Sequence, residues 1–362
     1  MKKIIFSKLA SLLILLLLLG GCSNGSTESH DPDSDFDTET EQVISDTDLE
    51  DEDEKNEETE PELDDTEEEI VLEPIAEFLG GKVVSETEIV FEFSMPVTLQ
   101  SLSLSFNPDI ELEKIYEGNT ITLYLGEDLE PGLRFIAEFE AEDEWDNLIN
   151  TQVSLIAKNN RPPDLLINEL RTEFSGSSQK EEFIEFKILS EGNLGGLQVF
   201  AASNKTNPMI YEFPPAEVME GEYVVLYLRT LDKPNNTDSF PTRSFWIPDS
   251  SKLLRKTDAV YVMDQDSRVL AAIMIAETPA ASWTITQLAE AAEFLFEQGA
   301  WTSEAGGISS PADAASSENI KTSLTRSISR DETMDDSRTA ADWYVTANNG
   351  ATPGLPNNPQ RF

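Results

Sequence analysis

The chain has 362 residues, with 70 Asp and Glu against 25 Lys and Arg and a formal net charge of −45. This excess of negative charge disfavours binding to nucleic-acid phosphates, because like charges repel. One Cys excludes a disulfide framework and multi-cysteine metal sites, and one His (His30) leaves little room for histidine-based catalysis.

The N-terminus has the pattern of a secretory signal: three lysines and a Leu-rich core at Leu9–Leu19. This core is about half as long as the ~20 apolar residues that span a bilayer. It ends in Leu19-Gly20-Gly21-Cys22, which resembles a bacterial lipobox. The resemblance implies that residues 1–21 are a lipoprotein signal peptide and that Cys22 carries the lipid, including palmitate, that anchors the chain to the membrane of the cell envelope. The alternative is an ordinary signal peptide with a chance Cys. Ser23, where Asp would indicate inner-membrane retention, favours the outer membrane; whether the protein faces the periplasm or the cell surface stays open.

The next segment, residues 22–72, is predicted to be a disordered acidic linker. From Ser23 to Glu69 it has 23 acidic residues against Lys55 alone, a net charge of −22, and few apolar side chains. Such a segment cannot bury enough apolar surface to offset its ordering entropy, and its charges repel. Alternating Asp residues resemble the start of an EF-hand loop, but the Gly and Glu that the loop requires are absent. We therefore predict no metal site and no cofactor.

Residues 73–160 show apolar residues at every second position, with turn signals between the runs. This period is typical of half-buried strands and predicts a small antiparallel β-sandwich. The runs are Ile89, Phe91 and Phe93; Leu102, Leu104 and Phe106; Ile121 and Leu123; and Phe135, Ala137 and Phe139.

Three motifs in this segment resemble the bacterial Ig-like domains of surface and S-layer proteins. They are a strand ending in Phe93-Ser-Met-Pro-Val97, then Leu129-Glu-Pro-Gly132 before an aromatic strand, and the turn Asp143–Asn147. The turn lacks the Gly that the family has. The resemblance implies an Ig-like fold that acts as a spacer.

Residues 163–358 contain a second series of short strands, including the unbroken apolar run Tyr223–Leu228 that a strand buried on both faces would show. The series resembles the lamin-tail domain, an Ig-like β-sandwich. The elements that carry the resemblance are Ile167-Asn-Glu169, Glu182–Phe186, Phe213-Pro214 with Gly221-Glu-Tyr223, Ser323–Arg326, and Trp343 with Thr352–Asn357. Insertions are expected near 230–251 and 277–320.

Within this segment Glu169 and Glu185 could form a carboxylate pair for catalysis, or they could be structural acids that bond to backbone groups. We favour the structural role and predict no catalytic residue. Arg326 and Arg330 are expected to bond to buried carbonyls or to acids such as Asp342.

The second insertion contains an expected amphipathic helix at 284–298. Thr284 and Gln287 have capping-box spacing, and Gly299 can end the helix. The helix either packs on the sandwich, which we favour, or offers a face to a partner. The Ala- and Ser-rich stretch after Trp301 is expected to be a mobile loop.

Taken together, the fold is expected to be all-β: two consecutive Ig-like antiparallel sandwiches, the second with a helical insertion, on an acidic tether. The predicted function is that of a lipid-anchored, non-enzymatic envelope lipoprotein that serves in adhesion or scaffolding by binding protein or glycan. The alternative is an envelope hydrolase, or an accessory subunit of a secreted nuclease or phosphatase. The pattern does not determine the oligomeric state.

Overall fold

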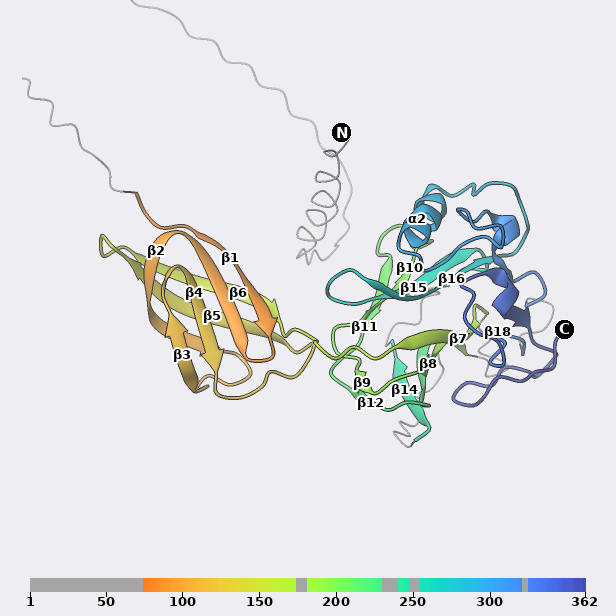
Figure 1. Cartoon of the computed structure of the whole chain (residues 1–362), viewed down its shortest axis with the longest axis horizontal. Helices are drawn as coiled ribbons and strands as arrows, with labels where there is room; N and C mark the ends of the chain where they lie inside the picture. Colours follow the sequence, from red (N-terminus) through yellow and green to blue (C-terminus); the bar gives the residue numbers. More distant parts are fainter. Residues whose placement is uncertain (1–73, 174–180, 230–239, 248–253, 321–324) are drawn as a thin grey trace, which may run out of the picture. The chain divides into compact units, whose positions relative to one another are not determined.

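Strands are the main regular secondary structure of the described chain, with one α-helix among them, which confirms the predicted all-β fold (Figure 1). The computed structural model describes residues 74–362 except 174–180, 230–239, 248–253 and 321–324. The predicted signal peptide 1–21, the lipidation site Cys22, His30 and the linker 22–72 lie outside the described residues. No helix in the described ranges has the length and apolarity to cross a membrane.

The first sandwich is a six-stranded antiparallel sheet around its own core. Its hydrogen-bonded order is β3-β4-β2-β5-β6, and β1 pairs with β2. Phe91 stacks on Phe139 at 4.5 Å in the core, as the period-two pattern predicts. The strands are β1 (Phe78–Ser85), β2 (Glu88–Leu104), β3 (Leu112–Tyr116), β4 (Gly118–Leu125), β5 (Arg134–Asp143) and β6 (Leu148–Ile156).

The strand β2 is longer than expected. The prediction that it ends at Pro96 and Val97 is wrong, because it continues to Leu104. Its pairing with β4 shifts between Glu92 and Val97, and beyond that point it pairs with β5. Proline lacks an N–H and interrupts the ladder, but its backbone angles suit an extended chain, so the strand changes partners without stopping.

The turn after β5 keeps its shape without the expected glycine. Asp146 stands where the Ig-like pattern has Gly, and it adopts a left-handed φ of 62°. The Asp143 carboxylate accepts hydrogen bonds from the backbone N–H groups of Trp145 and Asn147 at 2.9 and 3.0 Å. Aspartate tolerates the left-handed region better than most residues, so it can replace Gly here.

The second sandwich encloses its core between two sheets, of order β14-β13-β8-β7-β18-β19 and β11-β10-β15-β16-β17, with a small pair β12-β9. Its strands are β7 (Leu165–Arg171), β8 (Glu182–Ile188), β9 (Gly192–Asn193), β10 (Gln198–Ala201), β11 (Met209–Glu212), β12 (Glu217–Val218), β13 (Tyr223–Arg229), β14 (Thr242–Trp246), β15 (Asp258–Met263), β16 (Val269–Ala276), β17 (Ala315–Ser316), β18 (Ile328–Arg330) and β19 (Trp343–Val345).

Two strand pairs in this sandwich depart from the expected antiparallel pattern. Strands β13 and β14 are parallel, and so are β16 and β17. Both added strands, β14 and β17, come from the insertions predicted near 230–251 and 277–320. An insertion long enough to cross the sheet can return its chain in the parallel direction.

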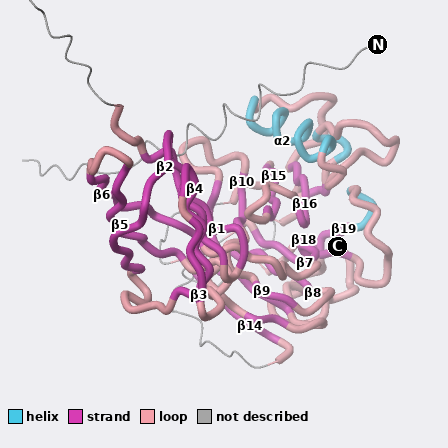
Figure 2. Tube along the Cα trace, turned by 60° about the vertical axis from the view of Figure 1, so that its left-hand side comes forward, coloured by secondary structure: helices cyan, strands magenta, loops and turns pink. Residues whose placement is uncertain are grey.

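The helix α2 (Thr286–Glu297) lies beside β15 and β16 (Figures 1 and 2). It buries Leu288, Ala291, Ala292 and Leu295, so the face that we expected packs on the sandwich. The predicted capping box is wrong: the N-cap is Ile285, one residue after Thr284, and no side chain caps it. Gly299, with φ 64°, ends the helix as predicted.

The stretch after Trp301 differs from the expected mobile loop. It contains a short 3₁₀-helix, Pro311–Asp313, that begins with a capping box at Ser310, and it continues into β17. Trp301 itself is 1% exposed and Ile320 is fully buried. Apolar anchors spaced along a polar stretch therefore fix its path, although its composition resembles a loop.

Candidate functional site

The two carboxylates that could form a catalytic pair lie opposite each other. Strands β7 and β8 pair antiparallel with Glu169 in register with Glu185, and both residues are 0% exposed. The strands thus bring together two residues that are 16 positions apart in the sequence. Their position between buried strands keeps both from solvent.

Glu169 accepts its hydrogen bonds from the protein itself. The donors are the hydroxyl groups of Ser327 and Ser329, the latter at 3.0 Å, and the backbone N–H of Thr352 at 3.0 Å. Ser327 directly precedes β18 and Ser329 lies within it, whereas Thr352 belongs to the C-terminal segment. Glu169 therefore joins three parts of the chain that are distant in the sequence.

Glu185 has a similar role one strand away. One oxygen accepts from the Asn168 side-chain amide at 2.8 Å, and the other accepts from the backbone N–H of Gly354 at 2.5 Å. Asn168 also donates to Glu332, whose other oxygen pairs with Lys187 at 3.1 Å. The sequence reasoning missed Glu332; only its place two residues after Arg330 could have indicated it.

These contacts decide what the carboxylates can do chemically. Every hydrogen bond described for Glu169 and Glu185 comes from a strand, a loop backbone or a neighbouring side chain of the same sandwich. A glycosidase-type pair must reach a substrate that lies between its two carboxyl groups. The buried pair instead fastens the Thr352–Gly354 turn to the sheet, which fits the structural interpretation of these acids.

Burial of these carboxylates predicts an unusual pH dependence of stability. Burial raises the pKa of Glu169, and burial with the neighbouring charge of Glu169 raises the pKa of Glu185 well above the ordinary value of 4.5. The folded state therefore binds the carboxyl protons of Glu169 and Glu185 more tightly than the unfolded state does. The contribution of these two groups to the free energy of unfolding falls as the pH rises above 4.5. In urea unfolding across the weakly acidic range, Glu185→Gln is expected to show a shallower decline than the unmodified protein.

The control for this pH series is Glu191→Gln, which removes a carboxyl from an exposed position of the same sandwich. It is expected to keep the slope of the unmodified protein. An identical slope in Glu185→Gln would contradict the assignment of a raised pKa to this group.

The two predicted arginines have different partners. Arg326 donates to the backbone carbonyl of Asn319 at 2.9 Å, as expected for a buried carbonyl partner. The Arg330 guanidinium lies 3.9 Å from the Asp342 carboxylate, the acid that the sequence indicated, and 3.4 Å from Asp336. Trp343 is partly buried at the edge of the core.

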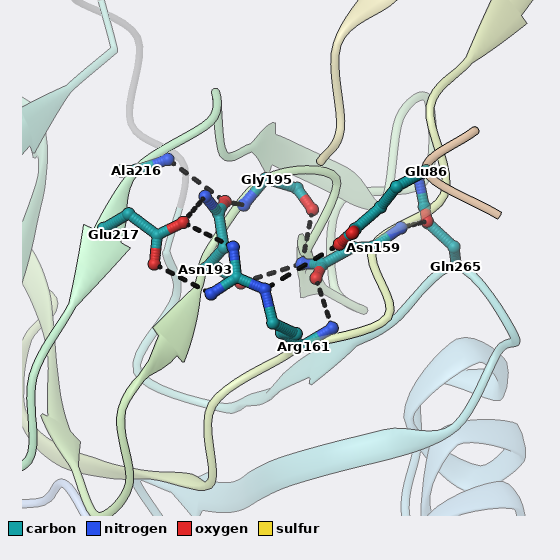
Figure 3. A network of polar contacts seen from close by, with 8 residues as sticks. All are labelled: Glu86, Asn159, Arg161, Asn193, Gly195, Ala216, Glu217 and Gln265. Carbon is teal, nitrogen blue, oxygen red and sulfur yellow. Dashed lines mark hydrogen bonds and ion pairs between the residues drawn. The ribbon is translucent and has the colours of Figure 1, made fainter. Parts of the chain in front are cut away.

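Figure 3 shows a polar network, the junction network, around the segment that connects the two cores. The Asn159 side chain donates to the carbonyls of Asn193 and Gly195 at 2.8 and 2.9 Å. Arg161 donates to both oxygens of Glu217, at 2.7 and 3.2 Å, and lies 3.7 Å from Glu86 of the loop between β1 and β2. The Arg161 side chain is 54% exposed, so each of its ion pairs contributes little by itself.

Two glycines beside the junction network allow a close backbone approach. A Cβ atom at Gly195 would lie 1.9 Å from the carbonyl oxygen of Pro131, and one at Gly132 would lie 2.2 Å from the carbonyl carbon of Gly195. Any larger residue would push these segments apart. The sequence motifs gave no sign that these two glycines meet.

Among the described residues, no group of three or more His, Cys, Asp or Glu side chains is placed to hold a metal ion. The carboxylate oxygens of Glu169 and Glu185 accept hydrogen bonds from donors of the protein itself. The side chains of this site can therefore pack, form hydrogen bonds and carry charge.

Three comparisons relate the chain to other proteins. A family described as the TP_1001 protein second domain matches residues 163–345. An uncharacterized protein of Treponema pallidum (strain Nichols) is 28% identical over 222 residues, which cover 55% of this chain and 54% of the relative. The chain thus spans about half the length of that curated relative. The N-terminal part of the bacterial S-layer protein SbsC aligns over 56% of this chain and 43% of its own, with 10% identity and a TM-score of 0.23.

Proposed function

This chain belongs to the TP_1001 protein second-domain family, and we propose that it is a lipid-anchored, non-enzymatic lipoprotein of the cell envelope that serves in adhesion or scaffolding. In this proposal Cys22 carries the lipid, the acidic linker acts as a tether, the Ig-like sandwich is a spacer, and the lamin-tail-like sandwich that it presents binds protein or glycan. The outer membrane is the proposed location.

One observation carries the non-enzymatic part of the proposal. Glu169 and Glu185, the one carboxylate pair that the sequence suggested for catalysis, are solvent-inaccessible and bonded to the fold. A general acid or base must be able to reach a substrate proton. No observation on the described residues favours the hydrolase alternative, so binding is the better-supported role.

The junction network supports a presenting role. It links the connecting segment to the second sandwich through Asn159 and to both Glu86 and Glu217 through Arg161. Such contacts restrict the connection between spacer and binding domain. A spacer that holds its neighbour in place suits a protein that displays a binding surface away from a membrane.

The lipid anchor is tested by metabolic labelling with radioactive palmitate. The unmodified protein is expected to carry the label and to sediment with membranes, whereas Cys22→Ala is expected to lose the label and leave the membrane fraction. The test is specific because the chain has a single Cys. An unlabelled protein, or equal labelling of the variant, would reject the anchor.

The binding role has its own test. The mature protein is expected to bind saturably to one of two separated envelope fractions, protein or polysaccharide. Absence of saturable binding to both fractions would contradict adhesion and scaffolding.

A further inference from the structure

The Arg330 guanidinium is buried, and one of its nitrogen atoms lacks a hydrogen bond. It stands at the end of β18 with a side chain that is 5% exposed, and its Nη2 atom has no hydrogen-bond partner in the described protein. Asp336 and Asp342 lie 3.4 and 3.9 Å away, close enough to offset its charge. The Asp342 oxygens accept instead from Ser337 and from the backbone of Arg338. A buried N–H group left unbonded is costly, so an acceptor that reached Nη2 would gain a hydrogen bond that the described protein does not supply.

Arg330 is among the residues that line two adjacent hollows of the second sandwich. It lines a surface depression of about 480 Å³ and an adjoining cavity of about 70 Å³, which share Leu166, Leu270, Arg330, Asp336 and Arg338. We refer to the two together as the Arg330 depression. Ligand sites commonly have volumes of roughly 300–1,000 Å³. The depression therefore has room for one or two residues of a peptide.

The walls of the Arg330 depression combine apolar surface with charge. Leu166, Leu270 and Met334 supply apolar lining. Its positively charged side chains are Lys187, Arg330 and Arg338, and its negatively charged ones are Asp164, Glu332, Asp335 and Asp336. Glu332 is held by Lys187, Asn168 and the backbone of Asn357, which leaves Arg330 as the buried cation with free donor capacity.

From this arrangement we propose that the Arg330 depression binds the C-terminal carboxylate of a peptide whose last side chain is apolar. The planar guanidinium fork matches a carboxylate, and the apolar wall receives the last side chain. Four acidic side chains stand against three basic ones around the depression, so a doubly charged phosphate is disfavoured more than a singly charged carboxylate, and a basic residue before the last one is favoured. The inference rests on the proposed binding role and names the chemistry of one ligand.

Calorimetric titration of the mature protein with two dipeptides tests the proposal. The probes are N-acetyl-Lys-Leu with a free carboxylate and the same compound with a terminal amide. The acid is expected to bind at least about tenfold more tightly than the amide, because only the acid offers two oxygen atoms and a charge to the guanidinium. Equal affinities for acid and amide, or tighter binding of inorganic phosphate, would overturn the proposal.

Variants locate the site. Arg330→Lys keeps the charge but loses the fork, and it is expected to weaken binding of the acid at least about tenfold. Arg338→Ala, at a side chain that is 59% exposed, is a second variant that is expected to weaken binding and to fold even where Arg330→Lys does not. The matched control Arg268→Ala removes an exposed arginine of the β15–β16 turn and is expected to bind normally. Unchanged affinity in both Arg330→Lys and Arg338→Ala would also overturn the proposal.

Failure of this proposal is distinguishable from failure of the proposed function. If the protein does not bind the dipeptide acid but still binds an envelope fraction saturably, it binds through a surface other than the Arg330 depression, and only the Arg330 proposal fails. A protein that binds neither contradicts both proposals.

Discussion

Replacing Glu169 by alanine is expected to lower the free energy of unfolding of the second sandwich by about 3 kcal/mol or more. The substitution removes, in a site that is closed to water, the acceptor of the Ser327 and Ser329 hydroxyl groups and of the Thr352 backbone N–H. The two hydroxyls keep only their contacts with each other and with Thr346. Each buried donor left unbonded costs about 1–3 kcal/mol, and the removed side chain leaves a cavity. Chemical unfolding monitored by tryptophan fluorescence measures the loss.

Glu191→Ala is the control for this prediction, since Glu191 is exposed on the same sandwich. It is expected to change stability by less than about 0.5 kcal/mol. If Glu169→Ala were as mild as Glu191→Ala, the described hydrogen bonds would not hold the C-terminal segment to the sheet.

Gly354→Ala is the second substitution with a large expected effect, about 2–4 kcal/mol. Gly354 has a left-handed φ of 83°, and a Cβ atom there would lie 2.6 Å from Thr242 Cγ2. Its N–H donates to Glu185 and its carbonyl accepts from the Thr242 hydroxyl at 2.6 Å. A side chain would therefore strain the backbone and displace both bonds. Thermal unfolding compared with the unmodified protein measures the effect.

Gly306→Ala separates the two causes. Gly306 has nearly the same φ, 82°, but no atom lies within 4 Å of the position of its Cβ. It therefore reports the cost of a left-handed alanine alone, about 1 kcal/mol. A loss of stability in Gly354→Ala no greater than in Gly306→Ala would show that the contacts with Thr242 and Glu185 contribute nothing.

The fold was predictable where local pattern and burial agree. The alternation of Ile89, Phe91 and Phe93 has period two because one face of β2 meets the core, and all three residues are at most 3% exposed. The apolar run of β13 is likewise almost wholly buried. The local sequence pattern did not predict structure that depends on a strand partner far along the chain. The strand β2 continues past Pro96 because it pairs there with β5, and β17 forms because it pairs in parallel with β16.

The candidate site was predictable in its residues but not in its contacts. Glu169, Glu185 and the Thr352–Gly354 turn all belong to motifs that the sequence singled out. Their mutual bonds depend on register between β7 and β8 and on the return of the C-terminal segment, which no local spacing encodes. Arg330 was expected to pair with acids and does so, yet the missing hydrogen bond at its Nη2 and the depression beside it follow only from the packed side chains around it.

The proposed non-enzymatic role of the buried carboxylates is tested most directly by a turnover assay with nucleotide and glycan substrates on three proteins. These are the unmodified protein, Glu185→Gln, and Leu295→Ala, which removes a fully buried α2 side chain and loses about 2–5 kcal/mol of stability away from the carboxylates. No turnover above a protein-free blank is expected in any of them. Turnover that Leu295→Ala retains and Glu185→Gln loses would contradict the proposed role.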